Sequence, residues 1–139
     1  MRAFAVVVTT LALAAPAAAA QPIRATLTTS TPTPVVDRPW RYTVTVRNAA
    51  GRPLAARTRL QILVGGTIVG CWKAGRLAQC LDGSPGQWIA FRGKRSGVLT
   101  WPAQSVGVTL TFQVVVQAGG QTRRLRAPVT VRAAREASS

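Results

Sequence analysis

The two cysteines of the chain both lie in the short segment CWKAGRLAQC, which runs from Cys71 to Cys80 and also holds Trp72, Lys73 and Arg76. Four kinds of site use such residues: a redox pair, part of a zinc site, a ligand-binding loop and a structural disulfide. Zinc would need further Cys or His ligands, which a chain without histidine could supply only by sharing the site with another chain. Redox pairs are normally Cys-x-x-Cys, whereas eight residues separate these two.

The N-terminus indicates the compartment in which these cysteines act. Arg2 precedes an apolar run over residues 4–15, and Pro16 and a series of alanines follow. This order is typical of a secretory signal peptide. The run is shorter than the roughly 20 residues that span a bilayer. We therefore expect residues 1–20 to be removed and the mature protein, with no transmembrane segment, to be secreted, either extracellular or associated with the cell envelope.

Export favours the disulfide interpretation of the cysteine segment. Cysteines of exported proteins meet oxidising conditions, and a lone pair is commonly oxidised to one bond. We therefore predict a Cys71–Cys80 disulfide. Closing a loop of this length stabilises a fold by about 2.5–3 kcal/mol in the chain-entropy model.

The remaining chemistry-bearing residues argue against an enzyme. Without histidine there is no imidazole base and no Ser-His arrangement. The three carboxylates are Asp37, Asp82 and Glu136, and the two aspartates lie in turn sequences. A glycosidase needs a facing carboxylate pair, and calcium needs an oxygen-rich cluster. We expect no enzymatic activity, no metal site and no cofactor.

Aromatic and basic side chains are interleaved between residues 72 and 95. Such a mixture can stack on sugars or bases while its cations hold phosphates or carboxylates. Together with a second basic run, the candidate anion- or ligand-binding residues are Trp72, Lys73, Arg76, Trp88, Arg92, Lys94, Arg95, Arg123, Arg124 and Arg126. The alternative is structural: Trp72, Trp88 and Phe91 close the end of the core, and the cations form a solvated rim.

The charge of the chain is strongly positive, with 18 basic and 3 acidic residues. Loss of Arg2 with the signal peptide leaves 17 basic and 3 acidic residues, a net charge of +14. Such a field attracts nucleic acid, acidic wall polymers or anionic lipid headgroups. The alternative is compositional, because 16 of the 18 cations are arginines, as a GC-rich genome would encode.

The sequence pattern predicts that β-strands position these residues. In WRYTVTVR, Trp40, Tyr42, Val44 and Val46 alternate with polar residues, which is typical of a strand with one buried face. The same alternation occurs in IRATLTTS, RTRLQILV, GVLTWP, VGVTLTFQVVVQ and QTRRLRAPVTVR, with inward residues beginning at Val106 in the fifth segment. Glycine-rich turns separate them, and Gly65-Gly66 has the spacing of a tight hairpin. The pattern predicts one all-β antiparallel sandwich of about seven strands.

Residues 24–132 resemble the secreted immunoglobulin-like domains of bacteria. The resemblance rests on TPTPVVDRPWRYTVTVRNAAGRPLAARTRLQILVGGTIVG and on GVLTWPAQSVGVTLTFQVVVQAGGQTRRLRAPVTVR. It implies an adhesive, spacer or interaction module without chemistry of its own. The chain departs from the antibody-type framework, because Cys71 and Cys80 are too close in sequence to join two core strands as that framework does.

The expected organisation is a signal peptide at 1–20, a Thr/Pro-containing leading segment with the first strand at 21–35, the immunoglobulin-like domain at 24–132 and a disordered tail at 133–139. Two functions remain open. The first is a non-enzymatic interaction or structural module of the cell envelope or extracellular space, with an envelope protein as partner. The second is a binder of anionic polymers such as wall polymer, nucleic acid or acidic glycan, through the basic aromatic loop at 72–95. A strand edge rich in arginine favours a monomer.

Overall fold

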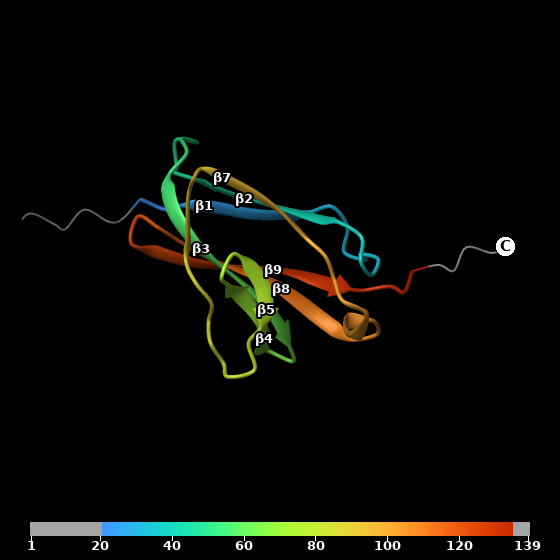
Figure 1. Ribbon diagram of the computed structural model, residues 1–139. Coiled ribbons are helices and arrows are strands. Elements are labelled where there is room, and N and C mark those ends of the chain that lie inside the picture. The colour runs from blue at the N-terminus through green and yellow to red at the C-terminus, as the bar shows by residue number, and fades with distance from the viewer. Residues whose placement is uncertain (1–20, 135–139) are drawn as a thin grey trace, which may run out of the picture.

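The computed structural model describes residues 21–134, which form nine β-strands (Figure 1). The predicted signal peptide at 1–20 and the last five residues of the predicted tail lie outside the described residues. The strands are β1 Arg24–Thr29, β2 Trp40–Arg47, β3 Ala55–Val64, β4 Thr67–Lys73, β5 Arg76–Gln79, β6 Ile89–Arg92, β7 Lys94–Leu99, β8 Thr109–Ala118 and β9 Gln121–Thr130. A 3₁₀ turn at Ala103–Ser105 is the one helical element of the described part, so the all-β prediction is confirmed.

Two antiparallel sheets face each other. One has three strands in the order β1-β2-β7, and the other has six, in the order β5-β4-β3-β8-β9 with β6 also paired to β3. In Figure 1, β1, β2 and β7 lie together above β8 and β9. The strand number exceeds the expected seven because residues 67–92 form three short strands, β4, β5 and β6.

One edge of β3 is shared by two short strands. β6 pairs with Ala55–Thr58, β4 pairs with residues 61–64, and β8 occupies the opposite edge. The chain therefore leaves β3 through β4 and β5 and returns to the same edge at β6. Gly65 and Gly66 connect β3 to β4 with φ of 56° and 80°, values that suit the predicted two-residue hairpin.

The segment between β1 and β2 crosses from one sheet to the other. The Thr130 N–H donates to the Pro32 carbonyl at 3.0 Å, and the Val36 N–H donates to the Arg132 carbonyl at 3.0 Å. Val35 and Arg132 form a parallel bridge. This crossing ties the two sheets together at one end of the molecule.

Aromatic side chains fill the centre between the sheets. The Trp40 ring lies 5.3 Å from that of Trp101 and 5.1 Å from that of Phe112, and Tyr42 lies 5.2 Å from Phe112. The Trp40 indole N–H donates to the Thr31 carbonyl at 2.7 Å. The inward alternation predicted for residues 40–46 is confirmed, since all four apolar side chains are buried.

The prediction that the inward face of β8 begins at Val106 is wrong. β8 begins at Thr109, and the Val106 side chain is 39% exposed. Gly107, with φ of 76°, and the 3₁₀ turn before it interrupt the strand here, and Val106 forms only an isolated parallel bridge with Val131.

Candidate functional site

The Cys71–Cys80 disulfide is present, as predicted, with the two Cα atoms 5.7 Å apart. Cys71 of β4 pairs with Gln61 of β3, whose neighbours Leu60 and Ile62 point into the core. The bond therefore lies on the outer face of the six-stranded sheet, where it fixes the end of β5 to β4.

Residues 81–88 follow the disulfide and pass over the outer face of the six-stranded sheet. The Gln87 N–H donates to the Trp72 carbonyl at 2.8 Å, and the Gln61 Nε2 donates to the Pro85 carbonyl at 2.9 Å. Gly86 packs so closely on Cys71 that an added Cβ would lie 3.0 Å from the Cys71 Cβ. This loop buries Gln61, an outward residue, to 4% exposure.

Two buried glutamines connect the loop to the far edge of the sheet. Gln113 Nε2 donates to Gln61 Oε1 at 2.7 Å, and Arg126 Nε donates to Gln113 Oε1 at 2.7 Å. The bonds run from β3 across β8 to β9. Because Nε is held by Gln113, the guanidinium of Arg126 is oriented and its two terminal nitrogens have no partner among the described residues.

Trp88 lies against two arginines of β3. The guanidinium carbons of Arg57 and Arg59 lie 4.4 Å and 4.0 Å from the Trp88 ring centroid, distances typical of cation–π contacts. Arg57 also donates from Nε and Nη2 to Gln117 Oε1, at 2.8 Å and 2.6 Å. The indole thus orients cations of its own chain.

These contacts lie on one cationic surface, which we name the basic face. Its cations are Arg57, Arg59, Arg92, Arg124 and Arg126, all on the outer face of the six-stranded sheet. Same-face neighbours on one strand are about 6.7 Å apart, and β3 and β9 are separated by about 9.6 Å across β8. Of the two carboxylates of the described residues, Asp37 lies before β2, and Asp82, in the loop after β5, forms its ion pair with Lys73 and not with one of these five arginines.

Four of the candidate residues chosen from the sequence meet on the basic face: Trp88, Arg92, Arg124 and Arg126. Arg57 and Arg59 belong to the same face but were not among those candidates. The signal that could have found them is their outward alternation with Thr58 and Leu60, together with their pairing across β8 to the basic run of β9.

The other candidates are dispersed. Trp72 packs against the core, and Lys94 pairs with Thr45 in the three-stranded sheet. Arg95 is opposite the core residue Val44, so its side chain starts on the inner side. Arg123, opposite Val116, is also on the inner side and donates to Gln121 Oε1 at 2.8 Å. Residues 72–95 do not form one contact surface, because they contribute to two sheets and to both faces.

Lys73 and Arg76 pair at the end of the β4–β5 hairpin. Lys73 Nζ lies 3.9 Å from Asp82 Oδ2. The Ser84 N–H donates to Asp82 Oδ1 at 3.0 Å, and this bond, followed by the charge of Lys73, lowers the pKa of Asp82. The carboxylate caps its own turn at the edge of the loop.

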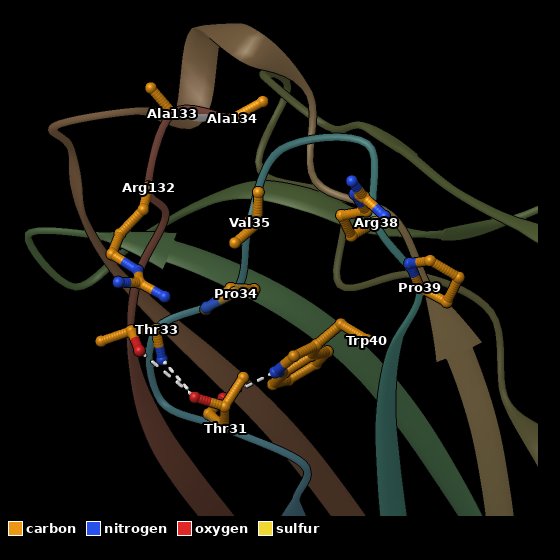
Figure 2. Close-up of a pocket in the computed structure, with 10 residues that line it drawn as sticks. All are labelled: Thr31, Thr33, Pro34, Val35, Arg38, Pro39, Trp40, Arg132, Ala133 and Ala134. Carbon is orange, nitrogen blue, oxygen red and sulfur yellow. Dashed lines mark hydrogen bonds between the residues drawn. The ribbon is translucent and has the colours of Figure 1, made fainter. Parts of the chain in front are cut away.

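A cleft of about 830 Å³ lies at the end where the chain crosses between the sheets (Figure 2). Arg38 and Arg132 lie on opposite sides of it, and Trp40 and Thr31 contribute to its wall. Its lining holds neither a carboxylate nor a nucleophile–base pair, so the cleft offers contacts to an anion but no acid–base chemistry.

No group of three or more His, Cys, Asp or Glu residues within residues 21–134 is arranged to hold a metal ion. The same range contains no helix with the length and hydropathy needed to cross a membrane. Comparison of the chain with protein-family models, with curated proteins and with solved structures found no match.

Proposed function

We propose that the protein is an exported, non-enzymatic immunoglobulin-like module of the bacterial envelope or extracellular space that binds an anionic polymer through its basic face. The observation that carries the proposal is the placement of five arginines on one face of one sheet, none of them ion-paired with a carboxylate of residues 21–134. Binding to a neutral partner protein, as a spacer or adhesive module, is the competing function.

The strand order supports the immunoglobulin-like assignment. The order β5-β4-β3-β8-β9 corresponds to C″-C′-C-F-G of variable-type domains, and β1-β2-β7 corresponds to A-B-E. The B–F disulfide of antibody domains would join β2 to β8. Here the rings of Trp40 and Tyr42 on β2 pack against Phe112 on β8 instead.

The basic face has the properties of a polyanion surface. Arginine binds phosphate and carboxylate through a planar fork of donors, and here Gln113 and Gln117 fix two of those forks. Cations about 6.7 Å and 9.6 Å apart on a rigid sheet can engage successive charges of an extended chain. The polymer class is therefore an acidic glycan, a wall polymer or single-stranded nucleic acid.

The dependence of binding on salt tests the proposal. Each polymer charge that an arginine neutralises releases counterions, so log K should fall against log salt with a slope of about −0.7 per contact on a flexible strand. Five arginines predict a slope of about −3.5 for heparin, teichoic acid or single-stranded DNA, measured by fluorescence titration. A slope shallower than about −1 for all three polymers would leave the spacer or adhesive function as the better account.

A further inference from the structure

β7 is an edge strand with unpaired backbone groups. In the described part of the chain it pairs with β2 alone. The Val46 N–H donates to the Gly93 carbonyl at 2.7 Å in the register that continues through Val44↔Arg95. Hydrogen-bonded pairs alternate in an antiparallel ladder, so the backbone groups of residues 95, 97 and 99 face β2. Those of residues 94, 96 and 98 face away from it.

An apolar groove lies beside the Leu99 end of this edge. The three-stranded sheet is too narrow to cover β4 and β5, and the inward side chains there are only partly buried. The groove measures about 450 Å³, and its apolar lining includes Ile62, Val64, Val69, Leu77, Trp101 and Pro102. Thr100, Trp101 and Pro102 follow β7 directly and all line the groove, so the groove borders the continuation of the free edge.

Within residues 21–134, the charged side chains on β7 and directly opposite it on β2 are cations, including Arg95 on the inner side of β7. Lys94 lies on the outer side of β7, and Val98 of β7 is paired with Arg41 of β2. Cationic edge strands repel a second copy of themselves. They complement a strand that carries carboxylates on its outer side, since opposite charges facing one another across a sheet are stabilising.

We propose that the free edge of β7 accepts an extended segment of a partner protein in which apolar and acidic residues alternate. The segment adds a fourth strand to the three-stranded sheet by bonding to the backbone of residues 94, 96 and 98. Its apolar side chains point inward to the groove above β4 and β5, and its acidic side chains lie on the outer side next to Lys94, with Arg41 one strand further away on β2. This interaction is independent of the basic face, which lies on the other sheet.

A peptide of ten alternating valine and glutamate residues is a suitable probe. We expect it to slow amide hydrogen exchange of Lys94, Ser96 and Val98 and to leave the amides beside Arg57 and Arg124 unchanged. A peptide with the same composition in two blocks, five valines followed by five glutamates, has the same charge without the alternation. It should bind at least tenfold more weakly.

Ser96 offers a matched pair of variants. The Ser96 hydroxyl bonds to Thr43 Oγ1 at 3.0 Å, and both Ser96→Ala and Ser96→Pro remove that bond. Only Ser96→Pro removes the outward N–H, and proline is tolerated on an edge strand at such a position. Affinity for the alternating peptide should stay within threefold in Ser96→Ala and fall at least tenfold in Ser96→Pro. A peptide N-methylated along one edge should lose the same affinity on the unaltered protein, which keeps the test independent of the folding of Ser96→Pro.

Three results would overturn the proposal. The first is equal affinity for the alternating and block peptides, which would mean that charge alone acts. The second is protection of amides on the basic face instead of β7. The third is a concentration-dependent dimer that Ser96→Pro dissociates, because a second copy would then be the occupant of the edge.

Discussion

Gln113, on the outer face of the six-stranded sheet, connects β3 to β9, because its side chain donates to Gln61 and accepts from Arg126. Gln113 is 5% exposed, so water cannot replace its hydrogen bonds to Gln61 and Arg126 unless the neighbouring side chains move apart. Gln113→Ala leaves a buried acceptor on Gln61 unpaired, and we expect a loss of about 1–3 kcal/mol in the free energy of unfolding by urea.

The matched control for Gln113 lies at the other end of the same strand face. Gln117 accepts from Arg57 at a more exposed position, where water can replace the lost bond. Gln117→Ala should cost less than about 0.5 kcal/mol. Equal losses of unfolding free energy in the two variants would mean that burial of the Gln61–Gln113 pair does not increase its contribution to stability.

Gly97 lies under a core ring, and a side chain there has no room. A Cβ at this position would lie 2.5 Å from the Tyr42 ring, and Tyr42 is fully buried. Gly97→Ala therefore forces the ring or β7 to move, at a cost of about 1–3 kcal/mol measured by thermal unfolding. Ser96→Ala, one residue away and exposed, serves as the control. A Gly97→Ala variant as stable as Ser96→Ala would contradict the packing of β7 on β2.

At the level of the elements, the disulfide closes the β4–β5 hairpin at the point where the loop that covers the outer face begins. The double variant Cys71→Ala/Cys80→Ala should lower the free energy of unfolding by about 2.5–3 kcal/mol, because the unfolded chain gains the freedom of an open loop. In this double variant, the Gln87 N–H, which is hydrogen-bonded to the Trp72 carbonyl, should also exchange with solvent faster than the amides of β8. An unchanged unfolding midpoint on adding reductant to the intact protein would contradict the expected loss of stability.

Periodicity in the sequence predicted the long strands well, because a segment in which apolar and polar residues alternate buries all its apolar side chains on one face only when it is an extended strand. The inward residues of β2 and β9 and the hairpin at Gly65 follow from local pattern alone. The partners of each strand do not, since pairing joins segments far apart in the chain. Arg57 and Arg126 share a face only because β8 lies between their strands.

The candidate site shows the same division between local and distant information. Residues 88–95 are contiguous in sequence, yet the chain passes from one sheet to the other at Gly93. Arg92 is therefore on the outer face of one sheet and Lys94 belongs to the other. Nothing in the local pattern marks that crossing apart from Gly93, where an added Cβ would clash with the Pro53 side chain.

At the scale of the whole molecule, the shortage of carboxylates sets the response to acid. Asp82 has a lowered pKa in the folded chain, so it binds a proton less tightly when folded than when unfolded. Its stabilising contribution is present above the unfolded pKa of about 3.9 and is lost as the pH falls through the lowered folded pKa. The melting temperature should therefore change little from pH 8 to 5 and fall below about pH 4.

The variant Asp82→Asn tests this origin of the acid response. It removes the titrating group and retains an oxygen that can accept from the Ser84 N–H. The melting temperature of the variant, followed by circular dichroism, should decline less than that of the unaltered protein below about pH 4. A parallel decline of the two proteins would place the acid sensitivity elsewhere in the molecule.

The proposed function depends on where the charge lies and not only on how much there is. The triple variant Arg57→Glu/Arg92→Glu/Arg124→Glu reverses three exposed cations of the basic face. The variant Arg24→Glu/Arg41→Glu/Arg52→Glu reverses three exposed cations outside it and has the same net charge. Any difference in polymer binding between the two variants reports position alone.

The most direct measurement is the affinity of these two triple variants for heparin at one fixed salt concentration, compared with that of the unaltered protein. We expect the basic-face variant to lose at least a hundredfold in affinity, since three contacts of at least about 1 kcal/mol each are replaced by repulsion. The control variant should lose less than tenfold. Equal losses in the two variants would contradict the account, because only the total charge of the molecule would then govern binding.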